Sequence, residues 1–342
     1  MNSIRDKITL SMGAGGRMSS ELMETVFMPA YGNDILNNLD DSAELLIGNA
    51  RVAYTTDSYT VKPIFFPGGD IGKLSICGTV NDLSVKGAKP MAISAGFIIE
   101  DGFPIESLKK IVRSMKETSL DAGVQIVTGD TKVVSRGEAD GIFINTSGIG
   151  FILPEMNVSC RNARVGDDVI ISGSIGDHGM AIMNARENLG FHPAIQSDVA
   201  PIWKIVDTIS GLGRHIHAMR DPTRGGVASV LNEIAKASRV NIKIFEKSLP
   251  IKDSIATSCN LLGLDPLYIA NEGKVIIFCD HCATDEILKR VKETLMGNGA
   301  ALIGKVVEDA YSDEIPPVCM ETLLGTKRFV PLIEGEPLPR IC

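Results

Sequence analysis

Apolar residues along the first half of the chain form short runs and one longer periodic segment. The runs at 51–57, 91–99, 124–128 and 142–146 have the length and the residue types of strands. Between the second and third runs, apolar residues at helical spacing begin at Ile105, with lysines and glutamates between them. We therefore predict a first α/β unit of about 150 residues.

The predicted helix from Ile105 has the flanking residues that helices prefer. Pro104 stands at its start, and Gly123 follows its last apolar residue. The segment before the first strand is rich in glycine and lacks such periodicity, so residues 1–40 are predicted to be mostly loop.

The second half of the chain repeats the alternation of strands and helices. An apolar run from Asp168 into Gly173 begins it. Helices are predicted near 201–212, 225–238 and 283–295, and strands near 240–245, 274–279 and 300–307.

The length of 342 residues exceeds what one core usually organises. Polar composition near residues 154–166 marks a boundary. We predict an N-terminal segment over 1–40, a first domain over 41–153, a second over 154–330, and a tail over 331–342. The tail contains three prolines and no periodicity, so we expect it to be extended and flexible.

The formal net charge of −8, without a basic patch, argues against a nucleic-acid partner. No apolar run reaches the roughly 18 residues of a membrane span, and residues 1–7 lack the apolar core of a signal peptide. We therefore expect a soluble, cytoplasmic protein with no membrane partner.

Five aspartates stand at predicted strand ends or turns. They are Asp41, Asp57, Asp82, Asp130 and Asp221, of which Asp57, Asp82 and Asp130 stand beside Gly, Thr or Asn. Carboxylates are the ligands of a Mg²⁺ ion that also holds phosphate oxygens. Each of them could instead cap a helix or form an Asx turn, so both readings stay open for a single aspartate.

Two glycine-rich segments could supply backbone N–H donors to a phosphate. One contains Gly13, Gly15 and Gly16, and the other begins at Gly225. Neither matches a phosphate-binding motif of known spacing. The glycines and aspartates together indicate a nucleotide triphosphate.

Two further charged residues follow or precede predicted strands. Lys132 could neutralise a phosphate or act as a base, and Glu272 could move a proton. Both could equally be solvated turn residues. His178 precedes an apolar helical stretch, where a role near a helix cap is favoured over a ligand contact.

The seven cysteines are scattered, which argues against a disulfide framework. Cys279 and Cys282 form one CxxC-like pair without a second pair, so a zinc site is the weaker of two readings. His215 and His217 alternate and share one strand face; a structural role is favoured over a metal pair.

Cys342 ends the proline-rich tail. Twelve extended residues span roughly 40 Å, enough to reach an active site. Arg340 could favour the thiolate. A terminal cysteine can also be an exposed residue without a role, and only the neighbouring motifs argue against that.

These motifs resemble the HypE family of hydrogenase maturation factors, carbamoyl dehydratases of the AIR-synthetase (PurM-like) superfamily. The resemblance covers essentially the whole chain. Its aspartate motifs are shared in looser form with selenophosphate synthetase and thiamine-phosphate kinase, whereas the last four residues single out this family. The segments that carry it are Gly13-Ala-Gly-Gly-Arg-Met, Asp40-Asp-Ser-Ala, Thr55-Thr-Asp-Ser-Tyr, Gly78-Thr-Val-Asn-Asp-Leu-Ser-Val-Lys-Gly-Ala-Lys-Pro90, Gly129-Asp-Thr-Lys-Val-Val134, Asp221-Pro-Thr-Arg-Gly-Gly226 and Pro339-Arg-Ile-Cys342.

The resemblance implies ATP-dependent dehydration of an S-carbamoyl group on Cys342 to a thiocyanate, which supplies cyanide to the iron of [NiFe]-hydrogenase. It implies ATP and Mg²⁺ as cofactors. Cys342, Lys132 and Glu272 would be the catalytic residues. The metal would be held by Asp41, Asp57, Asp82 and Asp221 and the nucleotide by Gly13, Gly15, Gly16, Asp130, Thr131, Asp221 and Gly225.

The resemblance also implies a PurM-like two-domain α/β (α+β) fold, in which the N-terminal domains of a homodimer form a β-barrel. Its partners would be the carbamoyltransferase HypF and the HypC–HypD scaffold complex. Two alternatives remain: a small-molecule kinase or synthetase of the same superfamily, and a carrier without catalytic activity. The carrier is disfavoured because it needs no nucleotide site.

Overall fold

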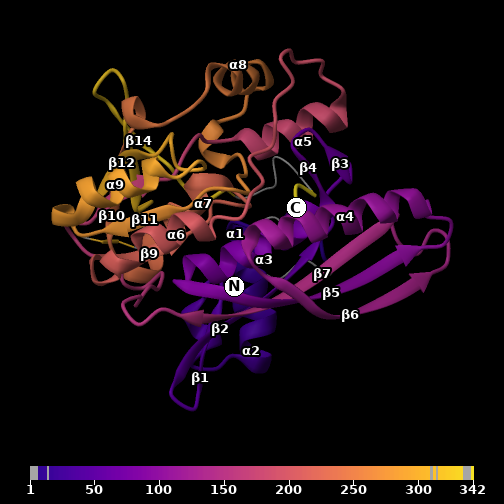
Figure 1. The fold of residues 1–342 in the computed structure, drawn as a ribbon. Coiled ribbons are helices and arrows are strands. Elements are labelled where there is room, and N and C mark those ends of the chain that lie inside the picture. Colours follow the sequence, from indigo (N-terminus) through magenta and orange to yellow (C-terminus); the bar gives the residue numbers. More distant parts are fainter. Residues whose placement is uncertain (1–6, 14, 309–310, 313–314, 334–339) are drawn as a thin grey trace.

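The chain folds into two α/β halves that lie side by side, and the C-terminal end lies between them (Figure 1). This computed structural model describes residues 7–13, 15–308, 311–312, 315–333 and 340–342. In these parts of the chain, no helix is long and apolar enough to cross a membrane.

The first half is built on a five-stranded sheet in the order β1-β2-β7-β5-β6. All neighbours are antiparallel except β5 and β6, which are parallel and are joined through a helix. The predicted strands are confirmed, and each is longer than its apolar run. The strands are β1 (Ala43–Ile47), β2 (Ala50–Tyr59), β5 (Ala88–Glu100), β6 (Gln125–Val134) and β7 (Ile142–Ile152). A hairpin of β3 (Phe65–Phe66) and β4 (Gly69–Asp70) stands apart from it.

Two helices cover one face of this sheet. The predicted helix is confirmed as α4 (Ile105–Ala122), with Pro104 as its N-cap and Gly123 in a left-handed conformation after its end. Helix α3 (Ile71–Val85) lies between α4 and the sheet and is buried on nearly all sides. Asp70 caps α3 by accepting hydrogen bonds from the N–H groups of the first turn.

Two of the aspartate motifs are not at the turns where the sequence placed them. Asp82 lies within α3, and Asp130 lies within β6 rather than at a strand end. A helix that is apolar on all sides shows no 3.6-residue period, so α3 could not be recognised from the pattern. Strand β6 continues because its polar residues lie on an edge strand.

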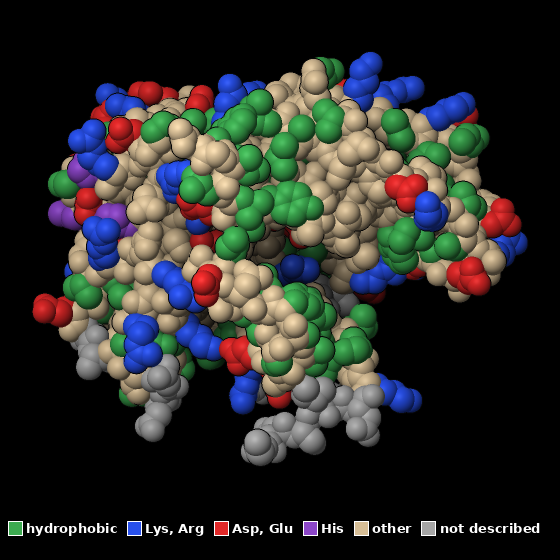
Figure 2. Space-filling view, turned by 90° about the horizontal axis from the view of Figure 1, so that it is seen from below, with side chains coloured by type: hydrophobic (Ala, Val, Ile, Leu, Met, Phe, Trp, Pro, Cys, Tyr) green, Lys and Arg blue, Asp and Glu red, His purple; other side chains and the backbone are tan. Residues whose placement is uncertain are grey.

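Among the described residues, no helix covers the other face of the five-stranded sheet. It exposes the apolar side chains of Tyr54, Met91, Ile98, Ile149 and Phe151. Tyr54 pairs directly with Ile149 across β2 and β7, so these two side chains are neighbours on the surface. Hydrophobic side chains are visible at the molecular surface in the view from below (Figure 2).

The second half is built on a seven-stranded sheet in the order β14-β13-β10-β12-β8-β11-β9. The predicted strands and helices of this half are confirmed within a few residues. The strands are β8 (Asp168–Ile171), β9 (Ile216–Arg220), β10 (Asn241–Phe245), β11 (Ile276–Cys279), β12 (Ala301–Val307), β13 (Val318–Glu321) and β14 (Lys327–Phe329). The helices are α5 (Asp177–Glu187), α6 (Trp203–Ile209), α7 (Gly226–Ser238), α8 (Asp253–Leu262) and α9 (Thr284–Glu293).

The prediction of a mostly loop-like N-terminal segment was wrong for residues 17–31. Helix α1 (Arg17–Leu22), a π-helical turn (Met23–Phe27) and α2 (Met28–Tyr31) follow one another there. Helix α1 has no side-chain cap, and the N–H of Arg17 instead donates to the carbonyl of Ile333. This helical segment therefore depends on a tertiary contact rather than on local signals.

Asn81 of α3 joins the two halves. Its amide donates to the carbonyls of Ala200 and Glu272, and its oxygen accepts from the N–H of Ile202. Because Asn81 is buried, these three bonds fix the backbone of Glu272 next to α3.

Candidate active site

A cavity of about 240 Å³ lies where the two halves meet. The surface seen from below is hollowed near its middle, with charged side chains inside the hollow (Figure 2). The lining of the cavity comes from the N-terminal loop, β2, α3, the segment from β9 to α7, and the end of the chain. Its residues are Gly15, Asp41, Thr55, Thr56, Asp57, Ser58, Tyr59, Gly78, Asp82, Arg220, Asp221, Thr223, Arg224, Val230, Glu233, Glu272 and Cys342.

Three of the predicted metal ligands converge in this cavity. Carboxylate oxygens of Asp41, Asp82 and Asp221 all lie within 4.8 Å of one another. Asp41 precedes β1, Asp82 is on α3, and Asp221 follows β9, so both halves contribute. Asp57, the fourth predicted ligand, lines the same cavity from β2.

These carboxyl groups are short of compensating charge. Burial raises the pKa of Asp41 to about 6 and that of Asp221 to about 8, and their neighbouring carboxylates add to the effect. Burial also raises the pKa of Asp57 and, well above its usual range, that of Asp82. Such a group of oxygens is completed by a cation.

Two arginines reduce this excess of negative charge. Arg220 pairs with Asp41 at 2.9 Å and with Glu233 at 3.3 Å. The negative charge of Cys342 is the main cause that raises the pKa of Arg224. Arg224 therefore lies where it favours an anion at the end of the chain.

Glu272 is buried in the cavity wall. Among the described residues, its Oε1 has no hydrogen-bond partner. Burial, followed by the charge of Asp221, raises the pKa of Glu272 well above its usual range. A buried carboxyl with an unpartnered oxygen is suited to exchanging a proton with a group bound beside it.

The last three residues are held against β2 and α5. The carbonyl of Cys342 accepts from the backbone N–H of Thr60 at 3.0 Å and from its hydroxyl at 3.2 Å. Arg340 accepts from Arg186 through its carbonyl and donates through Nε to the carbonyl of Thr60. The predicted flexibility of the tail falls partly on residues 334–339, outside the described part of the chain.

His178 also holds this end of the chain. Its Nε2 lies 2.8 Å from the carbonyl of Ile341, and its Nδ1 lies 2.8 Å from Oγ of Ser197. Because a carbonyl only accepts, the ring proton is on Nε2 and Nδ1 accepts from the serine. The sequence favoured a helix-cap role for His178. In the structure, its ring instead donates a hydrogen bond to the backbone of the tail at Ile341.

Glycines lie where the chain approaches the cavity closely. A Cβ on Gly15 would lie 3.1 Å from the side chain of Arg224. Gly225 is the N-cap of α7 in a left-handed conformation, and a Cβ there would lie 2.0 Å from Ser229 Oγ. Gly13 and Gly16 flank Gly15 in sequence without lining the cavity.

The structure does not bring the remaining three predicted residues to this cavity. Lys132 is 70% exposed and pairs with Asp130 beside it on β6. Asp130 and Thr131 line a different cavity of about 630 Å³ between β6 and α4. Within a single chain, Lys132, Asp130 and Thr131 therefore have no contact with the acidic cluster.

Sequence reasoning gave no role to Arg220 and Arg224, although both flank Asp221 in the quoted motif. It also gave none to Thr55, whose hydroxyl donates to Asp82 at 2.7 Å. The alternation of charge around Asp221 was the available signal, since a buried carboxylate needs a nearby cation.

Comparisons with known proteins agree with this architecture. The model for the N-terminal domain of AIR synthase related proteins matches residues 39–152, and that for the C-terminal domain matches 164–315. The carbamoyl dehydratase HypE of Rhizobium leguminosarum bv. viciae is 48% identical over 98% of this chain and 95% of its own length.

Two solved structures are similar to this fold. The HypE chain of a HypE–HypF complex superposes with a TM-score of 0.87 at 50% identity, covering 91% of this chain and 99% of that one. HypE in complex with ATP gives a TM-score of 0.81 at 44% identity, covering 98% and 100%. The two matched domains and the near full-length identity show that the chain belongs to the HypE family of carbamoyl dehydratases, within the AIR synthase related proteins.

Proposed function

We propose that the protein dehydrates an S-carbamoyl group on its own Cys342, with ATP, to a thiocyanate. The carbonyl oxygen attacks the γ-phosphorus of ATP and ADP leaves. Two protons then leave the nitrogen, the C–O bond breaks, and phosphate departs with the former carbonyl oxygen. The products are Cys342–S–C≡N, ADP and phosphate, and the cyano group would become a ligand of the iron of [NiFe]-hydrogenase.

One observation carries this proposal: Cys342 lines the same cavity as Glu272 and the acidic cluster. A thiocarbamate on Cys342 would therefore project into a space bounded by a carboxyl group and by candidate cation ligands. Phosphorylation makes the oxygen a good leaving group. Glu272, which has to lose its own proton first because its pKa is raised, would then accept a proton from the nitrogen.

The acidic cluster fits Mg²⁺, because it offers hard oxygen ligands in a buried position with insufficient positive charge. When bound, Mg²⁺ would neutralise phosphate oxygens of the nucleotide. Asp41, Asp82 and Asp221 would hold it, with Asp57 beside them. Arg224 would attract the anionic groups that develop next to Cys342.

The nucleotide would reach the cavity past the glycine loop. Gly15 lies in the cavity wall, and Gly225 starts α7, whose N–H groups favour phosphate. The structure of a relative in complex with ATP supports nucleotide binding by this chain. Gly13, Gly16 and Asp221 would complete the nucleotide contacts proposed from the sequence.

We also propose that two copies pair through the helix-free face of the five-stranded sheet. That face exposes apolar side chains on β2, β5 and β7, of which Tyr54 and Ile149 are paired. Pairing of the two sheets would produce the barrel that the resemblance implies. Lys132, opposite Ile98 on the neighbouring strand, would then lie at the junction of the two copies, and its proposed role beside the carboxamide depends on the second copy.

Two partners are proposed from the family. The carbamoyltransferase HypF would load Cys342, which the structure of a HypE–HypF complex supports. The HypC–HypD complex would receive the cyano group.

The reaction is tested by mass spectrometry of the C-terminal peptide after carbamoylation. The peptide should lose one water only when ATP and Mg²⁺ are present, and heavy oxygen placed in the carboxamide should appear in phosphate. A Cys342→Ala variant should show neither change. Undiminished turnover of a small substrate by Cys342→Ala would indicate a kinase or synthetase, and absence of nucleotide binding would indicate a carrier.

A further inference from the structure

Two adjacent groups of metal-binding residue types lie at the edge of the seven-stranded sheet and share Asp280: one is His215, Asp280 and Cys282, the other Asp167, His217 and Asp280. Neither shares a residue with the lining of the active-site cavity. His215 ends the 3-10 helix η4 (Ser210–His215), and His217 follows on β9. Asp280 comes directly after β11, and Cys282 lies in the 3-10 turn η7 (His281–Ala283). Two segments that are far apart in sequence thus meet here.

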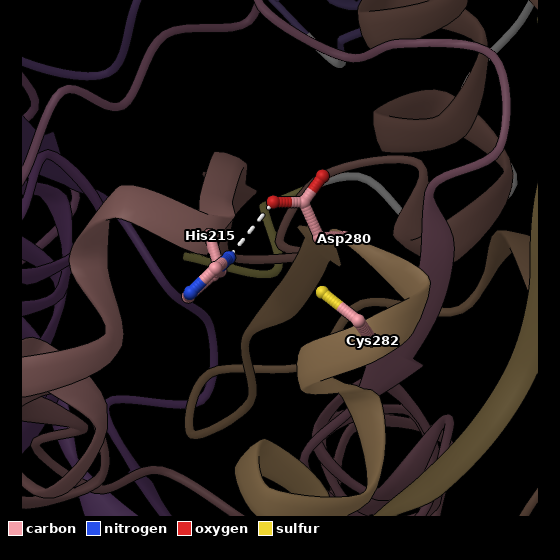
Figure 3. A group of neighbouring side chains, drawn as sticks. All are labelled: His215, Asp280 and Cys282. Carbon is pink, nitrogen blue, oxygen red and sulfur yellow. Dashed lines mark hydrogen bonds and ion pairs between the residues drawn. The ribbon is translucent and has the colours of Figure 1, made fainter.

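The side chains of His215, Asp280 and Cys282 point toward one another (Figure 3). Their ligand atoms all lie within 4.8 Å of one another, and Nδ1 of His215 is 2.9 Å from Oδ2 of Asp280. The N–H of Asp280 also donates to the carbonyl of His215, which fixes the two segments together.

His217 adds an independent observation. Its side chain is only 4% exposed, and among the described residues its buried Nε2 has no hydrogen-bond partner. That atom lies 3.7 Å from Oδ1 of Asp280. A buried nitrogen without a hydrogen-bond partner lowers the free energy of unfolding unless a ligand binds to it.

Asp167 fixes the orientation of this ring. Nδ1 of His217 lies 2.9 Å from the carboxylate of Asp167, which is itself held by the N–H of Arg164. Because the carboxylate accepts, the proton is on Nδ1, and the lone pair of Nε2 faces Asp280. Metal-binding histidines are oriented in this way, with a carboxylate behind the ring.

The backbone at this position is irregular. Between Phe278 and Cys279 the register of β11 against β9 shifts. Phe278 pairs with Ala218 and Cys279 pairs with Ile216, so His217 is an additional residue without a partner on β11. Bulges of this kind redirect a side chain and occur next to functional sites.

We propose that His215, His217, Asp280 and Cys282 bind a zinc ion, with Asp167 positioning His217. The donors are two imidazole nitrogens, one carboxylate oxygen and one thiolate, all of which are ligands of tetrahedral zinc. Ligand distances of about 2.0–2.3 Å give edges of roughly 3.3–3.8 Å between donors, and the His217–Asp280 separation of 3.7 Å already matches. The ion would replace the hydrogen bond between His215 and Asp280.

Cobalt binding to the chelator-treated, full-length protein tests this site, with Mg²⁺ present to occupy the acidic cluster. We expect one Co²⁺ per chain, tetrahedral visible absorption and a thiolate charge-transfer band, all displaced by Zn²⁺. Cys282→Ser should abolish the band. His217→Gln should weaken binding by about 100-fold or more, and Asp167→Asn by about 10–100-fold with the band retained.

Two matched variants control for other sites. Cys342→Ser removes the thiol of the active-site cavity, and His281→Gln removes an exposed histidine beside the cluster. Both should leave the Co²⁺ affinity and the band unchanged. A band that persists in Cys282→Ser, a band that disappears in Cys342→Ser, or the absence of a thiolate band in the wild type would overturn the proposal. Cys282 is exposed, so its replacement does not depend on repacking the core.

Discussion

At the scale of single residues, Glu272 and the three clustered aspartates have the same physical property. Each is a buried carboxyl group whose pKa is raised because burial penalises its charge. They differ in what surrounds them. The aspartates face one another, as cation ligands do, whereas Glu272 has an oxygen without a partner among the described residues.

The Glu272→Gln variant should separate proton transfer from nucleotide binding. Glutamine keeps the size and the backbone contacts of the residue but does not accept a proton. We expect ATP affinity to stay within about threefold, while the rate of dehydration falls by about 10²–10⁴-fold. Calorimetry and the mass of the C-terminal peptide measure the two quantities. Full conversion by Glu272→Gln would show that the proton leaves by another route.

The raised pKa of Asp221, about 8, predicts how metal-free protein responds to pH. Between the ordinary pKa of an aspartate and this value, the folded state binds a proton that the unfolded chain has lost. The contribution of Asp221 to the free energy of unfolding therefore decreases as pH rises from 6 to 8, by about 2 kcal/mol. Urea unfolding at several pH values should show this decrease relative to Asp221→Asn.

Mg²⁺ gives the matching control. It should stabilise the wild type more at pH 8 than at pH 6, because the ion binds the ionised carboxylates. It should have little effect on Asp221→Asn. A wild type that gains stability over the variant as pH rises without metal would contradict the assigned direction.

The sequence identified those residues whose side-chain type by itself indicates what they can bind. Asp41, Asp57, Asp82 and Asp221 were identified because carboxylates at predicted turns and strand ends suggest cation binding, and the fold brings them together. His178 was not identified as a tail ligand, because its partner is a backbone carbonyl that no sequence pattern marks.

At the scale of elements, the end of the chain behaves as an additional segment docked beside β2 and α5. Three backbone carbonyls, of Arg340, Ile341 and Cys342, each accept at least one hydrogen bond from the rest of the protein. Because these contacts are made through backbone atoms, a group carried on the sulfur of Cys342 would not remove them.

Replacing His178 by phenylalanine should loosen this docking. The variant keeps an aromatic ring but leaves the carbonyl of Ile341 without its donor, at a cost of about 1–3 kcal/mol. We expect alkylation of Cys342 to become at least several-fold faster, as followed by peptide mass spectrometry.

Alkylation of the exposed Cys282 in the same sample is an internal control and should not change. His281→Phe, at an exposed position, should leave both rates as in the wild type. An unchanged rate at Cys342 in His178→Phe would mean that the other tail contacts suffice.

The elements with a clear period were predicted well, and those without one were not. Helix α4 has one polar and one apolar face and was placed correctly, whereas α3 is buried and was not recognised. Strand β6 continues through Gly129 and Asp130, residues typical of turns, because its pairing with β5 outweighs local preference.

At the scale of the whole molecule, the helix-free face of the five-stranded sheet predicts association. Changing Phe151 to aspartate places a charge among the exposed apolar side chains at one end of the proposed interface. We expect the dimer to dissociate, with a dissociation constant at least about 100-fold higher, since burial of an unpaired charge costs several kcal/mol. Analytical ultracentrifugation measures this change.

Leu324→Asp is the matched control, because Leu324 is 90% exposed in the turn between β13 and β14. It should leave the oligomeric state unchanged. A wild type that is monomeric at high concentration, or a Phe151→Asp variant that remains dimeric, would argue against pairing through this face.

The acidic cluster draws its members from both halves of the molecule, Asp41 and Asp82 from one and Asp221 from the other. Without a cation, those carboxyl groups that are ionised repel one another across the junction. A bound cation would let the same oxygens hold the junction closed. We therefore expect a bound cation to make the two halves unfold together as one cooperative unit, and calorimetric unfolding with and without Mg²⁺ measures this.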